Sequence, residues 1–223
     1  MRTILFDLDG TLADTAPDLH HALHCLQQER GLTPLPFEQV RDHVSHGSAA
    51  LVTLGFPEAA GAVFDGLRER FLEIYSAHLH RESRLFPGMQ EVLEAIESRG
   101  MNWGIVTNKP AFLTDPLLRS MGLYDRAATV ISGDTTAERK PHPMPMLLAC
   151  EQSGSTPEQC LYIGDAHRDI EAGRAAGMRT LVARYGYIDA TQNPDAWGAD
   201  GFIQHPVDIM DWLPAQVGLG QAS

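Results

Sequence analysis

The chain has 223 residues, of which 43% are apolar and 21% charged, and its 29 acidic and 17 basic side chains give a formal net charge of −12. This composition is typical of a soluble globular protein that forms one large domain or two small ones. An acidic chain without a Lys/Arg cluster, and without an apolar run near the ~20 residues of a membrane span, is expected to bind neither nucleic acid nor a membrane.

Short apolar segments recur along the chain and predict buried strands. They cover residues 3–7, 102–106, 128–132, 160–164 and 179–183. Amphipathic stretches that end at a glycine lie between them, at residues 89–100, 112–122, 143–154 and 169–177. This alternation of helix, glycine and strand predicts an α/β fold with a parallel sheet and right-handed crossovers.

Residues 14 to about 80 lack this alternation, because leucines and phenylalanines recur there at helical spacing with no strand pattern between them. Asp14 or Thr15 is the expected N-cap of the first helix, with Pro17 in its first turn. We therefore predict an α/β core domain from residues 1–13 and 82–223 and a helical cap domain from residues 14–81. The tail from about Pro214 is rich in Gly, Ala and Gln and is expected to fray.

Two acids stand at the end of the first predicted strand. Asp7 and Asp9 flank one residue there, and ligands of open parallel sheets bind outside the carboxyl ends of the strands. Carboxylates this close repel each other unless a cation, a shared proton or strong donors compensate, so the pair indicates a divalent metal or separate roles. An Asx-turn that begins at Asp9 is the alternative.

Polar side chains also follow three later strands. Thr107 and Asn108 come after the second core strand, where a hydroxyl and amide groups can bind an anion. Lys140 lies in a proline-stiffened loop and can neutralise carboxylates or hold a phosphate. Asp165 and Asp169 follow the fourth strand four residues apart, and helix capping is the alternative explanation for either.

In this order, these side chains resemble the four motifs of the haloacid dehalogenase superfamily of phosphotransferases, and the resemblance covers nearly the whole chain. It implies a Rossmann-like parallel-sheet core with an inserted helical cap of the C1 type. The second acid, Asp9, further indicates a phosphatase or phosphomutase branch, because the true dehalogenases differ at that position.

The resemblance implies a magnesium-dependent reaction in which Asp7 is the nucleophile and Asp9 the general acid and base. Mg²⁺ is expected at the carboxylates of Asp7 and Asp165 and at the backbone carbonyl of Asp9, with Asp169 behind them. The expected substrate is a small phosphorylated metabolite.

The same resemblance implies that Thr107, Asn108 and Lys140 bind the phosphoryl group and that the cap contributes substrate contacts. The cap loop expected to face the substrate consists of His46, Gly47 and Ser48. A plain turn between two helices, beginning near residues 37 and 49, is the alternative for this loop.

A few further side chains are of interest outside that set. Lys109 and Arg184 each follow a core strand and are candidates for contacting the non-transferred part of the substrate. His20, His21 and His24 cluster on the first cap helix, and we interpret them as solvated rather than as a metal site.

Finer sequence features distinguish between possible phosphatase branches of this superfamily. The first motif, the cap position and residues 185–187 are similar to phosphoglycolate phosphatases, whereas segments 83–89, 103–110 and 185–200 are similar to bacterial N-acetylmuramic acid 6-phosphate phosphatases. We expect the latter activity, in peptidoglycan recycling, with 2-phosphoglycolate as the alternative substrate. A sugar phosphomutase and a non-catalytic phospho-receiver module are less favoured alternatives.

The cysteines indicate the cellular setting, whereas the assembly has no signature in the sequence. The three cysteines, Cys25, Cys150 and Cys160, are expected to be small buried side chains in a reducing cytoplasm. The chain is expected to be a monomer or a homodimer.

Overall fold

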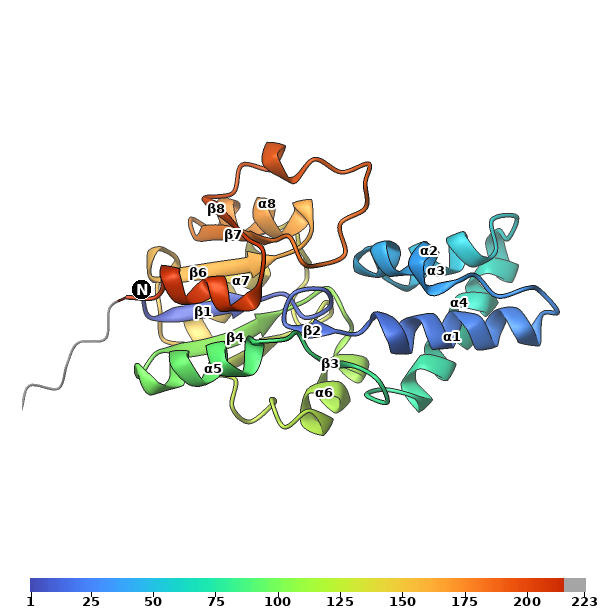
Figure 1. Ribbon diagram of the computed structural model, residues 1–223, viewed down its shortest axis with the longest axis horizontal. Coiled ribbons are helices and arrows are strands. Elements are labelled where there is room, and N and C mark those ends of the chain that lie inside the picture. The colour runs from blue at the N-terminus through green and yellow to red at the C-terminus, as the bar shows by residue number, and fades with distance from the viewer. Residues whose placement is uncertain (215–223) are drawn as a thin grey trace, which may run out of the picture.

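The computed structural model describes residues 1–214, so almost all of the tail expected to fray lies outside the described residues. Its largest element is a parallel sheet of six strands in the order β5-β4-β1-β6-β7-β8. The strands are β1 (Thr3–Phe6), β4 (Asn102–Val106), β5 (Thr129–Ile131), β6 (Cys160–Gly164), β7 (Arg179–Ala183) and β8 (Gly201–Ile203). The predicted α/β class and parallel sheet are therefore confirmed (Figure 1).

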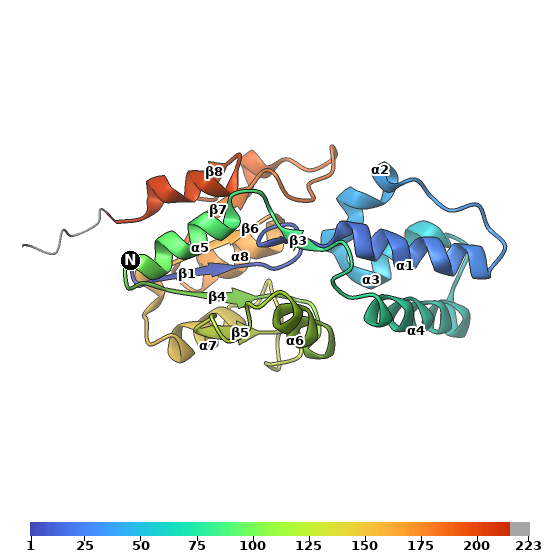
Figure 2. The same cartoon turned by 60° about the horizontal axis from the view of Figure 1, so that its bottom comes forward.

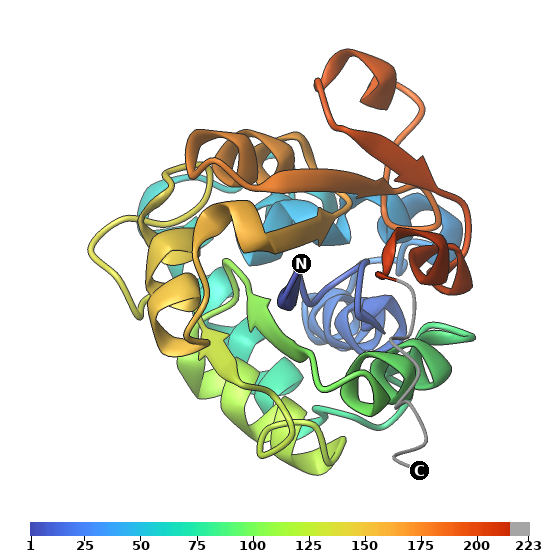
Figure 3. The same ribbon diagram turned by 90° about the vertical axis from the view of Figure 1, so that its left-hand side faces the viewer.

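Helices cover both faces of the sheet, as Figure 3 shows along the strands. They are α5 (Met89–Ser98), α6 (Ala111–Ser120), α7 (Met144–Gln152) and α8 (His167–Ala175), with 3₁₀ turns η2 (Pro157–Gln159), η3 (Pro194–Ala196) and η4 (Pro206–Trp212). Alternate strand residues point to opposite faces, so Ile4 and Phe6 pack with α5 and α6, whereas Leu5 packs with α7 and α8. Burial on both faces explains why the strands read as continuous apolar runs.

A helical region lies beyond the carboxyl ends of the strands (Figures 1 and 2). It comprises α1 (Ala16–Glu29), α2 (Phe37–Val40), η1 (Arg41–His46), α3 (Gly47–Gly55) and α4 (Gly61–Ala77). Its own apolar core includes Leu23, Leu26 and Phe71, all fully buried. The domain boundaries at residues 13/14 and 81/82 stay a prediction. Within residues 1–214, no helix combines the length and apolar character that a membrane crossing needs.

The two segments that connect this helical region to the sheet pair with each other. They form the short antiparallel strands β2 (Ala13–Asp14) and β3 (Arg84–Leu85), which the sequence pattern did not reveal. The buried carboxylate of Asp18, in the first turn of α1, accepts hydrogen bonds from the backbone N–H groups of residues 81–83 and from the Ser83 hydroxyl. The entering and returning chain are thus held side by side.

The start of α1 differs from its prediction in one respect. Thr15 occupies the N-cap position, but its side chain makes no capping hydrogen bond. Instead, the hydroxyl of Tyr187 accepts hydrogen bonds from the N–H groups of Thr15 (2.8 Å) and Ala16 (3.0 Å) and donates one to Asp14 (2.6 Å). A residue far away in sequence therefore satisfies the free donors at the beginning of this helix.

One strand was not predicted, and one smaller expectation needs correction. The edge strand β8 was not predicted, because its three residues are partly exposed and carry no helix–glycine signal before them. Cys150 and Cys160 are buried free thiols as expected, but Cys25 is half-exposed on α1.

Tyr187→Phe tests the link between sheet and helical region. Removing the hydroxyl leaves two buried N–H groups without a partner, so the free energy of unfolding is expected to fall by about 1–3 kcal/mol. Urea unfolding measures this, with Tyr124→Phe as the control because Tyr124 is partly exposed and its hydroxyl lies 3.5 Å from its partner Asp115. A loss no larger than that of the control would contradict the capping role.

Candidate active site

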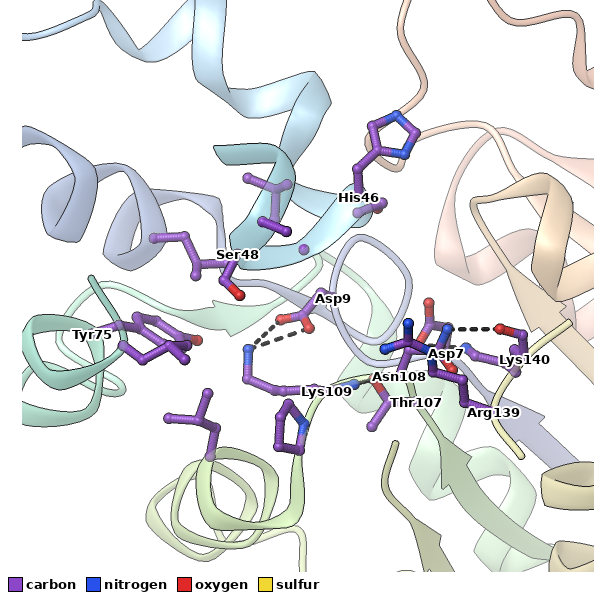
Figure 4. Close-up of a pocket in the computed structure, with 18 of the residues that line it drawn as sticks. Asp7, Asp9, His46, Ser48, Tyr75, Thr107, Asn108, Lys109, Arg139 and Lys140 are labelled. Carbon is purple, nitrogen blue, oxygen red and sulfur yellow. Dashed lines mark hydrogen bonds and ion pairs between the residues drawn. The ribbon is translucent and has the colours of Figure 1, made fainter. Parts of the chain in front are cut away.

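The sheet topology brings four chain segments to one place. β1 lies between β4 and β6, so the residues that follow these strands meet at the carboxyl edge where strand order reverses. Asp7 follows β1, Thr107 follows β4, Asp165 follows β6, and Lys140 enters from the loop after β5. Asp7, Thr107 and Lys140 line one cavity, and Lys140 forms an ion pair with Asp7 (Figure 4). Asp165 belongs to the same group of acids as Asp7.

Three carboxylates form the centre of this site. Asp7, Asp165 and Asp169 each offer an oxygen, and these oxygens all lie within 4.8 Å of one another. The side chains are almost inaccessible to solvent, with exposed fractions of 3%, 1% and 0%. In residues 1–214 they are the only His, Cys, Asp or Glu side chains grouped closely enough to hold a metal ion.

Lys140 is buried against these acids. Its Nζ lies 2.9 Å from Asp7 Oδ1 and 2.8 Å from Asp169 Oδ1, and it donates hydrogen bonds to the Val106 carbonyl (2.8 Å) and the Tyr162 hydroxyl (2.9 Å). The ammonium therefore neutralises part of the acidic cluster from a fixed position. A buried lysine without such partners would be strongly destabilising.

One ammonium does not balance three carboxylates. Burial raises the pKa of Asp7, although Lys140 opposes the shift, and burial together with Asp7 and Asp169 raises the pKa of Asp165 to about 7. The nearby Arg168 adds positive charge. Burial lowers the pKa of its guanidinium, but the acids Asp169, Asp7 and Asp165 raise this pKa by more, so the net shift is upward. The remaining negative charge must be met by protons or by a cation.

The surroundings of the cluster suit a cation with oxygen ligands. The donors are carboxylate oxygens, which hard divalent cations prefer. Two glycines keep the space next to Asp165 free of side chains: a Cβ atom on Gly10 would lie 2.1 Å from Asp165 Oδ2, and one on Gly186 would lie 2.3 Å from Asp165 Cβ. A buried cluster of this kind could hold a metal ion.

The side chain of Asp9 lies outside this cluster. Its carboxylate pairs with Lys109 Nζ at 3.0 and 3.3 Å and accepts a 2.5 Å hydrogen bond from the Thr15 hydroxyl. Burial lowers the pKa of Lys109, but Asp9 and Tyr75 raise it by more, so the ammonium keeps its charge. Lys109 also lines the cavity, so its expected contact with the substrate stays a prediction beside its contact with Asp9.

Thr107 and Asn108 lie beside Asp7 in the same cavity. The Thr107 hydroxyl accepts a hydrogen bond from the Lys109 N–H at 3.1 Å, and Asn108 Nδ2 donates one to the Lys140 carbonyl at 2.9 Å. Asn108 Oδ1 is buried and has no hydrogen-bond partner in the described part of the chain. These contacts fix both side chains at the strand end.

The cavity has a volume of about 640 Å³ and lies between the sheet edge and the helical region. His46, Gly47 and Ser48 line it, together with apolar side chains such as Phe71 and Tyr75. η1 ends at His46 and α3 begins at Gly47, so the segment 46–48 contains the junction of these two helices.

Sequence reasoning missed a set of contacts between the helical region and the acidic cluster. The Ser45 hydroxyl donates to Asp165 Oδ2 at 2.7 Å, and Arg168 Nη2 donates to the Ser45 carbonyl at 2.5 Å. The Tyr187 N–H also donates to Asp165 Oδ2, at 2.8 Å. The available signals were indirect: Ser45 precedes the predicted cap loop, and Arg168 lies between the two acids of the fourth motif.

Other sequence candidates lie elsewhere. Arg184 pairs with Asp195 and packs over Phe202, outside the cavity, so its expected substrate contact is wrong. His20 is not simply solvated, because its Nε2 lies 2.9 Å from the Leu35 carbonyl. His21 is exposed and lies close to Cys25 and His78.

Comparisons with known proteins agree with this architecture. Residues 4–183 match the family of haloacid dehalogenase-like hydrolases. A phosphoglycolate phosphatase of Xylella fastidiosa (strain Temecula1) is 45% identical over 205 residues, which cover 92% of this chain and 90% of that protein. An N-acetylmuramic acid 6-phosphate phosphatase of Pseudomonas aeruginosa is 42% identical over 214 residues, covering 96% and 95%.

Among solved structures, one described as a "predicted phosphoglycolate phosphatase" from Haemophilus somnus has a TM-score of 0.85 and 28% sequence identity, covering 95% of this chain and 97% of that one. The chain therefore belongs to the haloacid dehalogenase-like hydrolases, as its motifs indicated. It is a phosphatase of this family.

The raised pKa of Asp165 predicts how stability depends on pH in the presence of a chelator. Between about pH 4 and pH 7 the folded protein holds a proton on Asp165 that the unfolded chain has released, so the free energy of unfolding falls as pH rises. The contribution is on the order of a few kcal/mol. Urea unfolding from pH 5 to 8 measures this dependence. We expect the free energy of unfolding to fall less steeply with pH in Asp165→Asn than in the unmodified protein. Asp65→Asn, an exposed control on α4, should keep the original slope. Equal slopes for all three proteins would contradict the shift.

Proposed function

We propose that the protein is a Mg²⁺-dependent phosphomonoesterase that transfers the phosphoryl group first to Asp7 and then to water. The observation that carries the proposal is the position of Asp7. Its carboxylate follows β1, belongs to the acidic cluster and lines the cavity, and it lies 2.9 Å from Lys140 Nζ. A carboxylate in this setting is a suitable nucleophile for phosphorus.

Magnesium would be held by the carboxylates of Asp7 and Asp165 and by the backbone carbonyl of Asp9, with Asp169 fixing Lys140 behind them. When bound, the ion supplies positive charge that offsets the acidic cluster and the charge of the phosphoryl group. The chain itself contributes the ordered set of oxygen donors and the buried ammonium that keeps them in place.

The chain's own groups account for the remaining chemistry. A carboxylate oxygen of Asp7 forms the bond to phosphorus while the phosphorus–oxygen bond of the ester breaks, and Asp9 gives its proton to the departing alkoxide. Asp9 then removes a proton from the water that cleaves the aspartyl-phosphate. Lys109 and Thr15 hold the Asp9 carboxylate toward the cavity for both transfers.

Phosphoryl oxygens are proposed to bind at Thr107, Asn108 and Lys140, which line the cavity and lie near Asp7 in Figure 4. The alcohol part of the substrate would extend toward the helical region, where His46, Gly47 and Ser48 line the cavity. In this division of labour, residues 1–13 and 82–223 carry the chemistry and residues 14–81 select the substrate and shield it from water.

The best specific substrate is N-acetylmuramic acid 6-phosphate, with 2-phosphoglycolate as the alternative. Phosphatases named for both compounds are similar to this chain. A cavity of about 640 Å³ is in the range of roughly 300–1,000 Å³ that suits drug-sized ligands, and a two-carbon acid would fill little of it. The cavity size therefore favours the amino-sugar acid.

A phosphate-release assay with Mg²⁺ tests this proposal, using N-acetylmuramic acid 6-phosphate, 2-phosphoglycolate and common sugar phosphates. We expect release of inorganic phosphate, with the highest kcat/KM on the amino-sugar acid, and a fall in kcat of about three orders of magnitude or more for Asp7→Asn. Asp65→Asn is the matched control.

Isomerised product without phosphate release would instead indicate a phosphomutase. Activity of Asp7→Asn near that of the unmodified protein would remove Asp7 as the nucleophile. If N-acetylmuramic acid 6-phosphate were among the poorest substrates, the substrate assignment alone would fail.

A further inference from the structure

The side chains that line the cavity include more cations than acids. Its lining includes five cationic side chains but only two acids, Asp7 and Asp9, although the chain as a whole has a net charge of −12. Lys140 and Lys109 are paired with these acids. The remaining three cations are Arg68, Arg139 and Arg168.

Two of these arginines, Arg68 and Arg139, have no acidic partner. The third, Arg168, lies near the acidic cluster, whose negative charge raises its pKa although burial lowers it. Arg68 and Arg139 have no carboxylate within ion-pair distance among residues 1–214. Arg139 precedes Lys140 and lies at the phosphoryl end of the cavity. In Figure 4, Ser48 lies on the other side of Asp9 and Lys109 from Arg139 and Lys140.

Arg68 belongs to the Ser48 side of the cavity. It projects from α4, and its Nε donates a 3.1 Å hydrogen bond to the Ser48 hydroxyl at the beginning of α3. This bond orients the guanidinium, and its two terminal nitrogens form no hydrogen bond with any group of residues 1–214. Arg70, two residues further along α4, differs: its terminal nitrogens pair with Glu29 and Glu73 outside the cavity.

We propose that Arg68 binds a carboxylate on the alcohol part of the substrate, so that the enzyme selects phosphate esters of hydroxy acids. The inference rests on the proposed phosphatase function and adds the class of substrate. A guanidinium fork matches a carboxylate in geometry and in charge. A second phosphate group, with about −1.5 to −2 charge, would be matched less well by this single guanidinium. Both substrates considered above are hydroxy-acid esters.

Two esters that differ only in the lactyl group, which carries the acid, test the proposal. N-acetylglucosamine 6-phosphate has a free hydroxyl where N-acetylmuramic acid 6-phosphate carries the lactyl group. The ratio of their kcat/KM values therefore reports recognition of the lactyl group, and the change of this ratio in Arg68 variants reports the contact with its carboxylate. We expect Arg68→Gln to lower this ratio by about 10- to 100-fold, the loss of one charge-assisted hydrogen-bonded pair. Arg68→Lys, which keeps the charge but not the fork, should give an intermediate ratio.

Arg70→Gln is the matched control and should leave the ratio unchanged, because Arg70 faces away from the cavity. Arg68 is exposed, so Arg68→Gln should fold normally, and its thermal midpoint checks this. An unchanged ratio in a folded Arg68→Gln variant would overturn the proposal, and so would a preference of the unmodified enzyme for the ester without the acid.

The failure of the proposed function would look different. In that case no phosphate ester, including p-nitrophenyl phosphate, would be hydrolysed by the unmodified protein with Mg²⁺. Hydrolysis of p-nitrophenyl phosphate together with an unchanged ratio would instead retain the phosphatase and remove only the carboxylate contact.

Discussion

The structure depends on three carboxylates that share one buried place with a single lysine. Asp7, Asp165 and Asp169 would repel each other in the absence of Lys140, whose ammonium contacts two of them and is itself held by the Val106 carbonyl and the Tyr162 hydroxyl. The remaining imbalance appears as the raised pKa values of Asp7 and Asp165. Such an arrangement costs stability in the free protein, and it is of use where a cation and an anionic substrate complete it.

The same cluster connects the chemistry to the shape of the cavity. Asp165 accepts hydrogen bonds from the Ser45 hydroxyl of the helical region and from the Tyr187 N–H of the sheet region. Tyr187 also contacts the first residues of α1 through its hydroxyl, and Arg168 donates to the Ser45 carbonyl. A change in the charge around Asp165 therefore acts directly on groups that hold the two regions together. The contact between the two regions and the charge balance of the acidic cluster thus share one carboxylate.

Much of the fold could be predicted because its signals are local. Several helices end two residues before a glycine, and an apolar run follows; this pattern locates the central strands. The acids, the hydroxyl and the lysine of the site come after these strands in the sequence. The rest depends on tertiary contacts. The capping of α1 by Tyr187 and the Ser45–Asp165 bond join residues more than a hundred positions apart. Arg184 follows β7 just as Thr107 follows β4. However, β4 is next to β1 whereas β7 is two strands away from it, and no local pattern in the sequence reveals this order.

The central claim, that the acidic cluster holds a divalent cation, is tested most directly by locating such an ion. Mn²⁺ can stand in for Mg²⁺, and its anomalous scattering in crystals marks its position. The account predicts one strong anomalous peak within coordination distance of carboxylate oxygens of both Asp7 and Asp165, lost in Asp165→Asn. A protein that hydrolyses phosphate esters with Mn²⁺ but binds the ion elsewhere, with no peak between these two residues, would contradict it.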